Sequence, residues 1–425
     1  MPLLTNRSIS RDMKLWLEKK LAVQLLLIFA SGIFLFSSCC GEEIDLSSFL
    51  EAPEQPYQEE YELVLVDTFS IVVPDSADYN PHVKLLYKDS LLYTLSIKNR
   101  WSLDVYDLPN HKYVKRISLD PNFYKESLDN FNLFEDGKIL AIGSIPYINL
   151  YAIEKDGTPL QTFDFGKIGL FPSQTIEIYS AVNPSYFSGA FPLIVDESQV
   201  VLSFTIPEAF YKYYPDASKA AHVALFNLQT KKLEHYYETP KNIYSSVKSS
   251  AYPTDLAYAR KMLKGDTLLV TYPMDHYVYG YNVNSSELLF KKPVSSKYIS
   301  KLPAPLGRSE YNDRELSWDY RISVPFYEGI NYHAGVNLYS RVIHHDMIAR
   351  MPDGKRNKGE NRSSSIIILN ENFEKIGETL IEKAQFGVFK NLPIADGFYV
   401  GSETVHHSSD DEFIIKYKYE FRRVE

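Results

Sequence analysis

The strongest constraint on the fold is a loose repeat of short strands joined by turns, which runs from Lys88 to the C-terminus. One unit passes through the turn Lys88–Ser90 into the strands LLYTLSI, SLDVYDL and YVKRISL. A later unit passes through Lys264–Asp266 into TLLVTYP, YVYGYNV and ELLFKKP. About six such units follow one another, and a unit of three or four antiparallel strands repeated in this way is typical of a β-propeller. One unit cannot bury both of its faces, so neighbouring units must cover them in a closed ring.

The two ends of the chain indicate how such a ring closes. The last unit reaches the C-terminus without an outer strand, whereas the strand ELVLVDTFSIVV at residues 62–73 precedes the first complete unit. We therefore predict an all-β fold, a six-bladed β-propeller of antiparallel blades that is closed by this N-terminal strand. A pair of β-sandwiches would not need the recurrence, and a β-helix would repeat over a much shorter period. Helices are expected only at residues 253–264 and, interrupted by Pro215, at 207–221.

The N-terminal residues predict export and lipidation. An apolar run at residues 21–36 is followed by two serines and Cys39. The run holds about 16 residues, fewer than the ~20 that span a bilayer as a helix, and it fits the apolar part of a signal peptide. Cleavage before Cys39 would leave its thiol to carry a lipid, whereas Cys40 fits the pattern less well. An uncleaved anchor is the alternative, and Met13 competes with Met1 as the true start. The basic residues before the run are Arg7, Arg11, Lys14, Lys19 and Lys20.

These signals divide the chain into three parts. They are a lipoprotein signal peptide at residues 1–38, an acidic flexible linker at 39–60 and a single β-propeller domain at 61–425. The acidic stretch directly after Cys39 resembles the export signal that sends lipoproteins of the Bacteroidetes to the cell surface, and a merely solvated linker is the alternative. We expect a protein that is lipid-anchored in the bacterial outer membrane and faces the periplasm or the cell surface.

Charge and cysteine content bear on partners and stability. Residues 1–38 hold five of the 45 basic and two of the 54 acidic residues, so the remainder has 40 against 52 and a net charge of −12. Nucleic acid demands a basic face, so we expect no nucleic-acid partner. No cysteine follows Cys40, so the domain has no internal disulfide and must be held by its core. The many aromatic residues, 33 Tyr and 24 Phe, favour strands.

Three segments resemble a known family. The FSSC motif before an acidic stretch, the segment SLLYTLSIKNRWSLDVYDL and the segment VPFYEGINYHAGVNLYSRVIHH resemble Bacteroidetes lipoproteins of the domain-of-unknown-function 4221 (DUF4221) family. His333 follows Tyr332 where the family pattern has Asp. The resemblance implies a six-bladed propeller and brings no known activity. The matching positions of the last segment are Pro325, Tyr327, Ile330, Tyr332, Tyr339 and Arg341.

Metal and catalytic signatures are weak in this sequence. Neighbouring side chains on a strand point to opposite faces, so His344 and His345 would need a bulge to share a metal, with partners such as His333, His406 or Asp410. The alternative is a strand end with one exposed and one hydrogen-bonded histidine. The chain contains no Gly-x-Ser-x-Gly, His-Glu-x-x-His or phosphate-binding glycine-rich motif. We expect no metal and no cofactor, and no carboxylate pair stands out for glycoside hydrolysis.

A stretch rich in Tyr and Arg at residues 311–346 is the best candidate for a binding region. Tyr and Arg often anchor partners at interfaces, aromatic faces suit sugars, and long loops tend to be functional. We predict a binding or scaffold module for a glycan, a peptide or a partner protein at the propeller mouth. The alternatives are tyrosines that only pack between blades, and a hydrolase or lyase in the channel, which convergent carboxylates or histidines would favour. The candidate binding residues are Arg321, Tyr327, Tyr332, Tyr339, Arg341 and His344.

Overall fold

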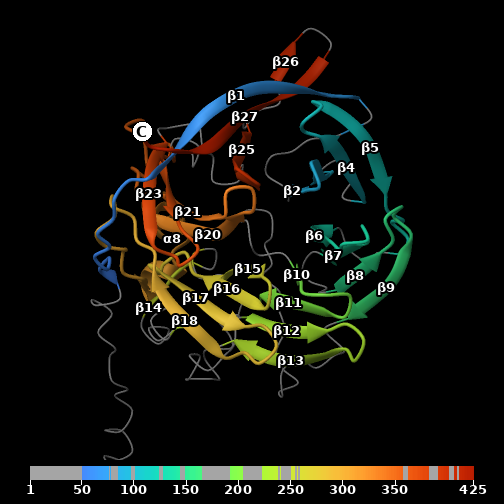
Figure 1. Cartoon of the computed structure of the whole chain (residues 1–425), viewed down its shortest axis with the longest axis horizontal. Helices are drawn as coiled ribbons and strands as arrows, with labels where there is room; N and C mark the ends of the chain where they lie inside the picture. Colours follow the sequence, from blue (N-terminus) through green and yellow to red (C-terminus); the bar gives the residue numbers. More distant parts are fainter. Residues whose placement is uncertain are drawn as a thin grey trace, which may run out of the picture. The chain divides into compact units, whose positions relative to one another are not determined.

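Six antiparallel β-sheets form a ring in the computed structural model of the chain (Figure 1). Each sheet is one blade of a six-bladed β-propeller, so the fold class predicted from the repeat is confirmed. The structure describes residues 50–75, 77, 85–96, 101–123, 128–143, 149–164, 192–203, 223–237, 240, 250–253, 256, 259–357, 362–381, 391–401, 406–408 and 411–425.

Each of the first five sheets contains four strands that are consecutive in the chain, with the innermost strand first. The first sheet contains β2 (Leu85–Lys88), β3 (Leu91–Leu95), β4 (Ser102–Asp107) and β5 (Lys112–Ser118). The second contains β6 (Leu128–Leu133), β7 (Ile139–Gly143), β8 (Asn149–Ile153) and β9 (Pro159–Asp164). The third contains β10 (Leu193–Ile194), β11 (Gln199–Ser203), β12 (Val223–Asn227) and β13 (Lys232–Tyr237). The fourth contains β15 (Arg260–Lys264), β16 (Thr267–Thr271), β17 (Tyr277–Asn282) and β18 (Leu288–Pro293). The fifth contains β20 (Phe326–His333), β21 (Leu338–His344), β22 (Ser364–Leu369) and β23 (Lys375–Ile381).

The sixth sheet joins the two ends of the domain. It contains β24 (Asn391–Ile394), β25 (Gly397–Gly401) and β27 (Asp411–Arg423), with the short β26 (His406–Ser408) paired to β27. Its outermost strand is β1 (Tyr61–Val73), which pairs antiparallel with β27 from Tyr61 opposite Arg423 to Val73 opposite Glu412. The predicted closure of the ring by the N-terminal strand is therefore confirmed.

Burial explains why the sheets need one another. All residues of β7 and β22 are buried, whereas Leu288 and Leu289 of the outer strand β18 are half exposed. A separate apolar cluster lies between each pair of neighbouring sheets. Between the sixth and first sheets, Phe69 and Ile71 of β1 pack with Leu92. The core is thus divided into six layers, and ring closure completes the last of them.

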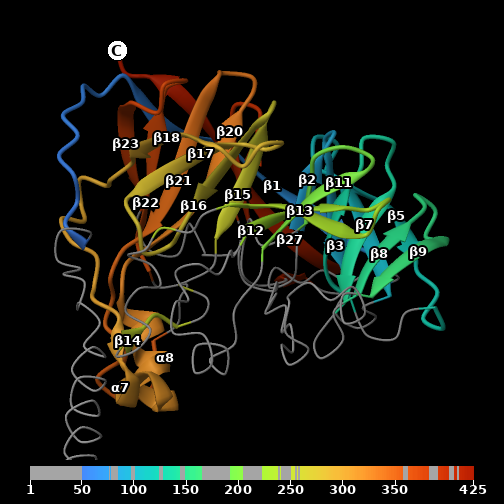
Figure 2. The ribbon, with the colours of Figure 1, turned by 90° about the horizontal axis from the view of Figure 1, so that it is seen from below.

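A helical insertion separates the fourth and fifth sheets. It contains α7 (Arg308–Asn312) and α8 (Arg314–Ser323), preceded by β19 (Leu306–Gly307), which pairs with β14 (Ser250–Ala251). The Asp313 carboxylate starts α8 by accepting hydrogen bonds from the first free backbone N–H groups. Figure 2 shows α7, α8 and β14 on one side of the ring, here called the insertion side.

The predicted helices are not those that form. The expected helix at residues 253–264 is wrong from residue 260 onward, because Arg260–Lys264 pairs with β16 as the innermost strand of its sheet. The other expected helix, at 207–221, lies outside the described residues. The two helices of the insertion lie in a stretch that the sequence analysis treated as a long loop.

Residues 50–60, here called the N-terminal strap, lie against the ring although they belong to the predicted linker. The backbone N–H of Ala52 donates to the carbonyl oxygen of Ser300 at 2.8 Å. At the other end, the N–H of Glu60 donates to the carbonyl of Ile376 at 2.8 Å, directly before β1 begins. The chain is therefore attached to the propeller from Leu50 onward.

The predicted signal peptide and the predicted lipidation site Cys39 lie outside the described residues. Within the described part of the chain, no helix has the length and apolar character needed to cross a membrane.

Candidate functional site

Arg341, a predicted binding residue, is buried in the interface between the fourth and fifth sheets, here called the 4–5 interface. Its guanidinium stacks 4.1 Å from the ring centre of Tyr327, which β20 supplies. Its Nη2 atom donates to the carbonyl oxygens of Tyr272 and Asp275, at 3.0 Å each. Burial lowers the pKa of Arg341 to about 10, so it stays charged at pH 7. Arg341 therefore links the fifth sheet to the loop between β16 and β17, and its guanidinium group bonds to backbone carbonyls of the protein itself.

A chain of hydrogen bonds runs from Tyr327 through the same interface. The backbone N–H of Ser296 donates to the Tyr327 hydroxyl at 3.1 Å, and this hydroxyl lies 2.8 Å from His276 Nδ1. His276 Nε2 lies 3.1 Å from the carbonyl oxygen of Leu50. Because a carbonyl only accepts, Nε2 carries the proton and Nδ1 accepts from Tyr327. Burial lowers the pKa of His276 to about 4, so a neutral imidazole holds the first residue of the strap.

His344, another predicted binding residue, belongs to a buried cluster near the innermost strands. Its Nε2 lies 3.4 Å from Glu328, and Arg260 Nε lies 3.8 Å from the same carboxylate. A bulge between Tyr327 and Ile330 interrupts the register of β20 where Glu328 stands. His344 Nδ1 lies 2.7 Å from Ser364 Oγ, and burial lowers the pKa of His344.

This cluster contains the residue types of a hydrolase triad without access for a substrate. Ser364, His344 and Glu328 could act as nucleophile, base and orienting carboxylate. However, Ser364 and His344 have no exposed surface and Glu328 is only 2% exposed. In this structure the cluster links β15 of the fourth sheet to β20 and β21 of the fifth, and so it connects the two sheets.

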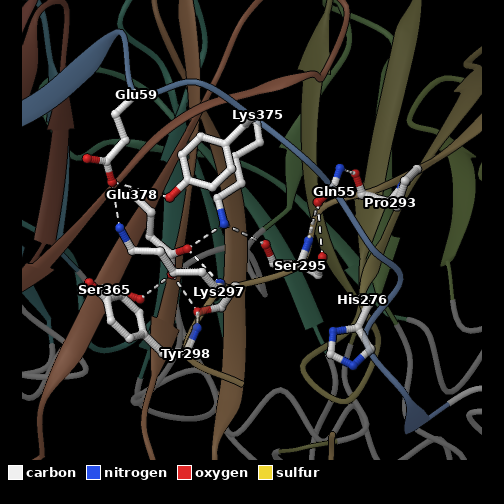
Figure 3. A network of polar contacts seen from close by, with 12 residues as sticks. Gln55, Glu59, His276, Pro293, Ser295, Lys297, Tyr298, Ser365, Lys375 and Glu378 are labelled. Carbon is white, nitrogen blue, oxygen red and sulfur yellow. Dashed lines mark hydrogen bonds and ion pairs between the residues drawn. The ribbon is translucent and has the colours of Figure 1, made fainter. Parts of the chain in front are cut away.

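A second buried network surrounds Glu378 on β23 (Figure 3). The ammonium group of Lys375 lies 2.5 Å from its carboxylate, and burial lowers the pKa of this lysine while the ion pair opposes that shift. The network extends to the strap, because the Ser295 N–H donates to Gln55 Oε1 at 2.8 Å. Four donors bind the Glu378 carboxylate, so its capacity to accept hydrogen bonds is used within the protein. They are Ser296 Oγ, Ser365 Oγ, the Lys297 N–H and Lys375 Nζ.

Tyr332 and Tyr339, two further predicted residues, lie side by side on the β20–β21 hairpin, with ring centres 5.0 Å apart. The Tyr332 hydroxyl donates to Asn337 at 2.9 Å, and the Lys264 ammonium lies 3.4 Å from the Tyr332 ring centre. The Tyr339 ring lies 4.6 Å from that of Phe373. These rings pack against a turn and a neighbouring sheet.

Arg321 lies apart from the other predicted residues, on α8. It lines an open groove of about 310 Å³ on the insertion, here called the α8 groove. Its guanidinium lies 5.1 Å from the ring centre of Trp318, and this indole is 42% exposed. The groove thus combines an aromatic face with cationic and polar groups. Its lining residues are Tyr311, Asn312, Arg314, Ser317, Trp318 and Arg321.

Helical spacing brings the groove residues together. Arg314, Trp318 and Arg321 recur at i, i+4 and i+7, which places them on one face of α8. Tyr320 lies on another face and donates its hydroxyl to the carbonyl of Ala304 at 2.8 Å. None of the ten residues of α8 is buried. A short helix of this kind is marginal by itself in water, so contacts outside the helix must stabilise it.

Ion pairs supply part of that support. Arg350 Nε lies 2.6 Å from Asp319, and Arg356 Nη2 lies 2.5 Å from Glu315. Glu315 and Asp319 are spaced i, i+4 on a face of α8 beside the groove face. These ion pairs therefore hold the segment at residues 347–357 against one face of α8, and the groove lies on the neighbouring face of the helix.

The structure thus brings together only part of the predicted site. Tyr327, Arg341 and His344 share the 4–5 interface and are buried, Tyr332 and Tyr339 lie further along the same hairpin, and Arg321 lies on the insertion. Sequence reasoning did not select Trp318. The i, i+4, i+7 spacing of Arg314, Trp318 and Arg321 was the available signal.

In the part of the chain that the structure describes, no three His, Cys, Asp or Glu side chains are grouped as metal ligands. His344 and His345 contact different serines, Ser364 at 2.7 Å and Ser365 at 3.0 Å. Asp410, a partner considered for a metal, lies outside the described residues.

The fold is a six-bladed propeller. The buried ionisable side chains described above contact other groups of the protein, and the helical insertion carries a groove at the surface. The model of a family described as a domain of unknown function (DUF4221) matches residues 59–380, and the chain belongs to this family. The resemblance noted in the sequence is therefore confirmed.

Solved structures share the fold. A member of the DUF4221 family from Bacteroides vulgatus is 14% identical, with a TM-score of 0.64, over 86% of this chain and 100% of that one. A Bacteroides fragilis protein that is described as exported is 12% identical, with a TM-score of 0.48, over 89% of this chain and 99% of that one. None of the curated proteins compared is similar to this chain.

Proposed function

We propose that this protein is a lipid-anchored binding module of the bacterial outer membrane, and that the α8 groove is its ligand site. The signal sequence and Cys39 support the anchor. The observation that carries the binding role is the exposed face of α8, where a half-exposed indole lies beside two arginines in a groove. The propeller acts as a rigid frame that holds this helix outside the ring.

The groove chemistry favours an acidic saccharide. The Trp318 ring offers an apolar face on which a pyranose can stack, as aromatic side chains do in binding sites. The exposed Arg314 offers a planar guanidinium group that matches a carboxylate with two parallel hydrogen bonds, and Arg321 adds positive charge beside Trp318. Asn312 and Ser317 add an amide and a hydroxyl for sugar hydroxyl groups. A peptide or a partner protein would use the same aromatic and cationic anchors but would not need the two polar groups.

The alternative of a hydrolase or lyase rests on the Ser364–His344–Glu328 cluster. All three residues are buried, and a reaction would need a conformational opening between the fourth and fifth sheets. Binding needs no such opening, because Trp318 and Arg314 are exposed already. Binding is therefore the function that the geometry supports best.

Calorimetric titration with two tetrasaccharides tests the proposal, one built of uronic acids and one neutral. We expect binding of the acidic probe only. Trp318→Ala should weaken it about 30-fold, as expected for an interface residue worth about 2 kcal/mol. Arg314→Ala should weaken it about tenfold.

The matched control is Leu316→Ala, because Leu316 is 49% exposed on the same helix but does not line the groove. It should leave the affinity unchanged. Equal binding of both tetrasaccharides, or equal losses in Leu316→Ala and Trp318→Ala, would contradict the proposed site.

A further inference from the structure

The N-terminal strap fixes the point at which the chain leaves the propeller. The carbonyl of Leu50 accepts hydrogen bonds from the Leu302 N–H at 2.8 Å and from His276 at 3.1 Å. Ser295 Oγ donates to the carbonyl of Pro53 at 2.9 Å. The strap is therefore held by main-chain and side-chain bonds from its first residue onward.

The remaining tether is short. Ten residues lie between the predicted lipid-bearing Cys39 and Leu50. Even a fully extended chain from Cys39 to Leu50 reaches at most about 40 Å. The part of the ring around Leu50 is therefore confined close to the membrane that holds the lipid.

Leu50 lies on the insertion side of the ring. Its partner His276 belongs to the connection between β16 and β17, and the N–H of Tyr327, at the start of β20, donates to Pro273 in that connection at 2.9 Å. Because α8 directly precedes β20, the strap begins on the side from which α7 and α8 project. In Figure 2 the strap runs from that side along the outside of the ring to β1.

The insertion and the segment at residues 347–357 beside it present apolar side chains to the outside. Ile348 is 76% exposed, Leu316 49%, Trp318 42% and Met351 37%. Exposed apolar groups of this size mark interaction surfaces. Trp is the side chain most suited to the headgroup level of a membrane, and Arg can keep its charge in water while its stem lies along apolar surface. The exposed Arg314 and the partly exposed Arg321 line the groove with Trp318.

We propose that the insertion side of the propeller lies on the membrane that carries the anchor, and that the α8 groove takes the acidic sugar of a glycolipid headgroup. This inference rests on the proposed function and names the source of its ligand. The short tether orients the ring, the exposed apolar residues contact the headgroup region, and the guanidinium groups meet the negative charge.

Tryptophan fluorescence of the full lipidated chain in vesicles tests the orientation. The chain has three tryptophans, Trp16, Trp101 and Trp318, and the first is lost with the predicted signal peptide. The variant Trp101→Phe thus leaves Trp318 as the sole reporter. Brominated phosphatidylcholine should reduce its emission roughly twofold relative to unbrominated lipid, because interfacial tryptophans lie next to the acyl chains. Adding a ganglioside, an acidic glycolipid, should increase this quenching.

The control reporter lies at the opposite side of the ring. Ser285 is exposed in the turn between β17 and β18, at the far ends of those strands from His276. A chain with Ser285→Trp, Trp101→Phe and Trp318→Phe should show no quenching by brominated lipid. Both reporters are at exposed positions, and Trp101→Phe, which both chains carry, keeps an aromatic ring against the cluster between the first and second sheets.

The outcomes separate this inference from the proposed function. Quenching of Trp318 that grows with ganglioside supports the inference. Quenching of the tryptophan from Ser285→Trp, or of neither reporter, overturns the orientation. Quenching that ganglioside does not change overturns the glycolipid source. If soluble uronic tetrasaccharides still bind in these two cases, the proposed function stands while the inference fails.

Discussion

The interfaces on the two sides of the ring are built differently. Between the first and second sheets the buried contact is made by aliphatic and aromatic side chains, such as Leu103 and Phe131, and the partly buried Lys88 donates to the carbonyl oxygens of Leu133 and Phe134. The 4–5 interface also has an apolar cluster, but Arg341 and His276 run through it and bond to backbone carbonyls. Apolar contacts are non-directional, whereas hydrogen bonds specify their partners. The 4–5 interface, which bears the strap and the insertion, therefore has a buried cation and a buried imidazole bonded to carbonyls, whereas the hydrogen bonds between the first and second sheets come from the partly buried Lys88.

The largest expected effect comes from removing the central cation of the 4–5 interface. Arg341→Met should lower the free energy of unfolding by about 3–4 kcal/mol, because the carbonyls of Tyr272 and Asp275 would lose their donor while staying buried. Urea denaturation measures the change. The matched variant in the apolar interface is Ile139→Val, which should cost about 1 kcal/mol. Equal losses of stability in the two variants would show that the hydrogen bonds of Arg341 contribute no more to the 4–5 interface than one methyl group contributes to the apolar interface.

A pH dependence of intermediate size should belong to the 4–5 interface. His276 has a pKa of about 4 when folded and 6.5 when unfolded, so the unfolded state binds more protons between these values. Its contribution to stability is intact above pH 6.5 and is lost as the pH falls toward 4. Between pH 7 and pH 5 this amounts to about 2 kcal/mol. His276→Gln should flatten the pH dependence of unfolding by that amount.

Asp275 provides a control of opposite sign. Burial raises its pKa to about 6 from 3.8, so its protonation stabilises the folded state as the pH falls. Asp275→Asn should therefore make the acid loss steeper. A change in the same direction for both variants would refute the assignment of the pH dependence to these two groups.

The smallest effect is expected at the surface of the strap. Glu51 and Lys301 form an ion pair at 2.7 Å, but both side chains are more than half exposed. Exposed pairs contribute between about 0 and 1 kcal/mol, so Glu51→Gln should change the urea midpoint little at low salt and less at high salt. A loss comparable to that of Arg341→Met would mean that surface charge rather than buried hydrogen bonding holds the strap.

The sequence predicted the middle strands of the blades because their burial is visible locally. β7 and β22 are buried on both faces and are almost continuous runs of apolar residues. The innermost strands carry no such signal, since β10 has two residues and β24 contains a proline. α8 was missed because its regular spacing involves Arg and Trp rather than apolar residues facing a core.

The candidate site was harder to predict for a different reason. Tyr327, Arg341 and His344 are close to one another in the sequence, but their burial depends on partners from the fourth sheet, such as Pro273 and Asp275. A single sequence does not show which loop of a distant blade covers a side chain. The sequence could point to the region that holds Arg321, but only the fold separates this partly exposed arginine from the fully buried Arg341.

The position of the strap has a mechanical consequence. β1 is both the strand that closes the ring and the strand that directly follows the strap. A pulling force on the N-terminus must first break the bonds at Leu50, Ala52 and Pro53 before it reaches the pairing of β1 with β27. A force applied ahead of Leu50 therefore acts first on the strap, and the strand pairing that closes the ring bears it only after the strap has detached.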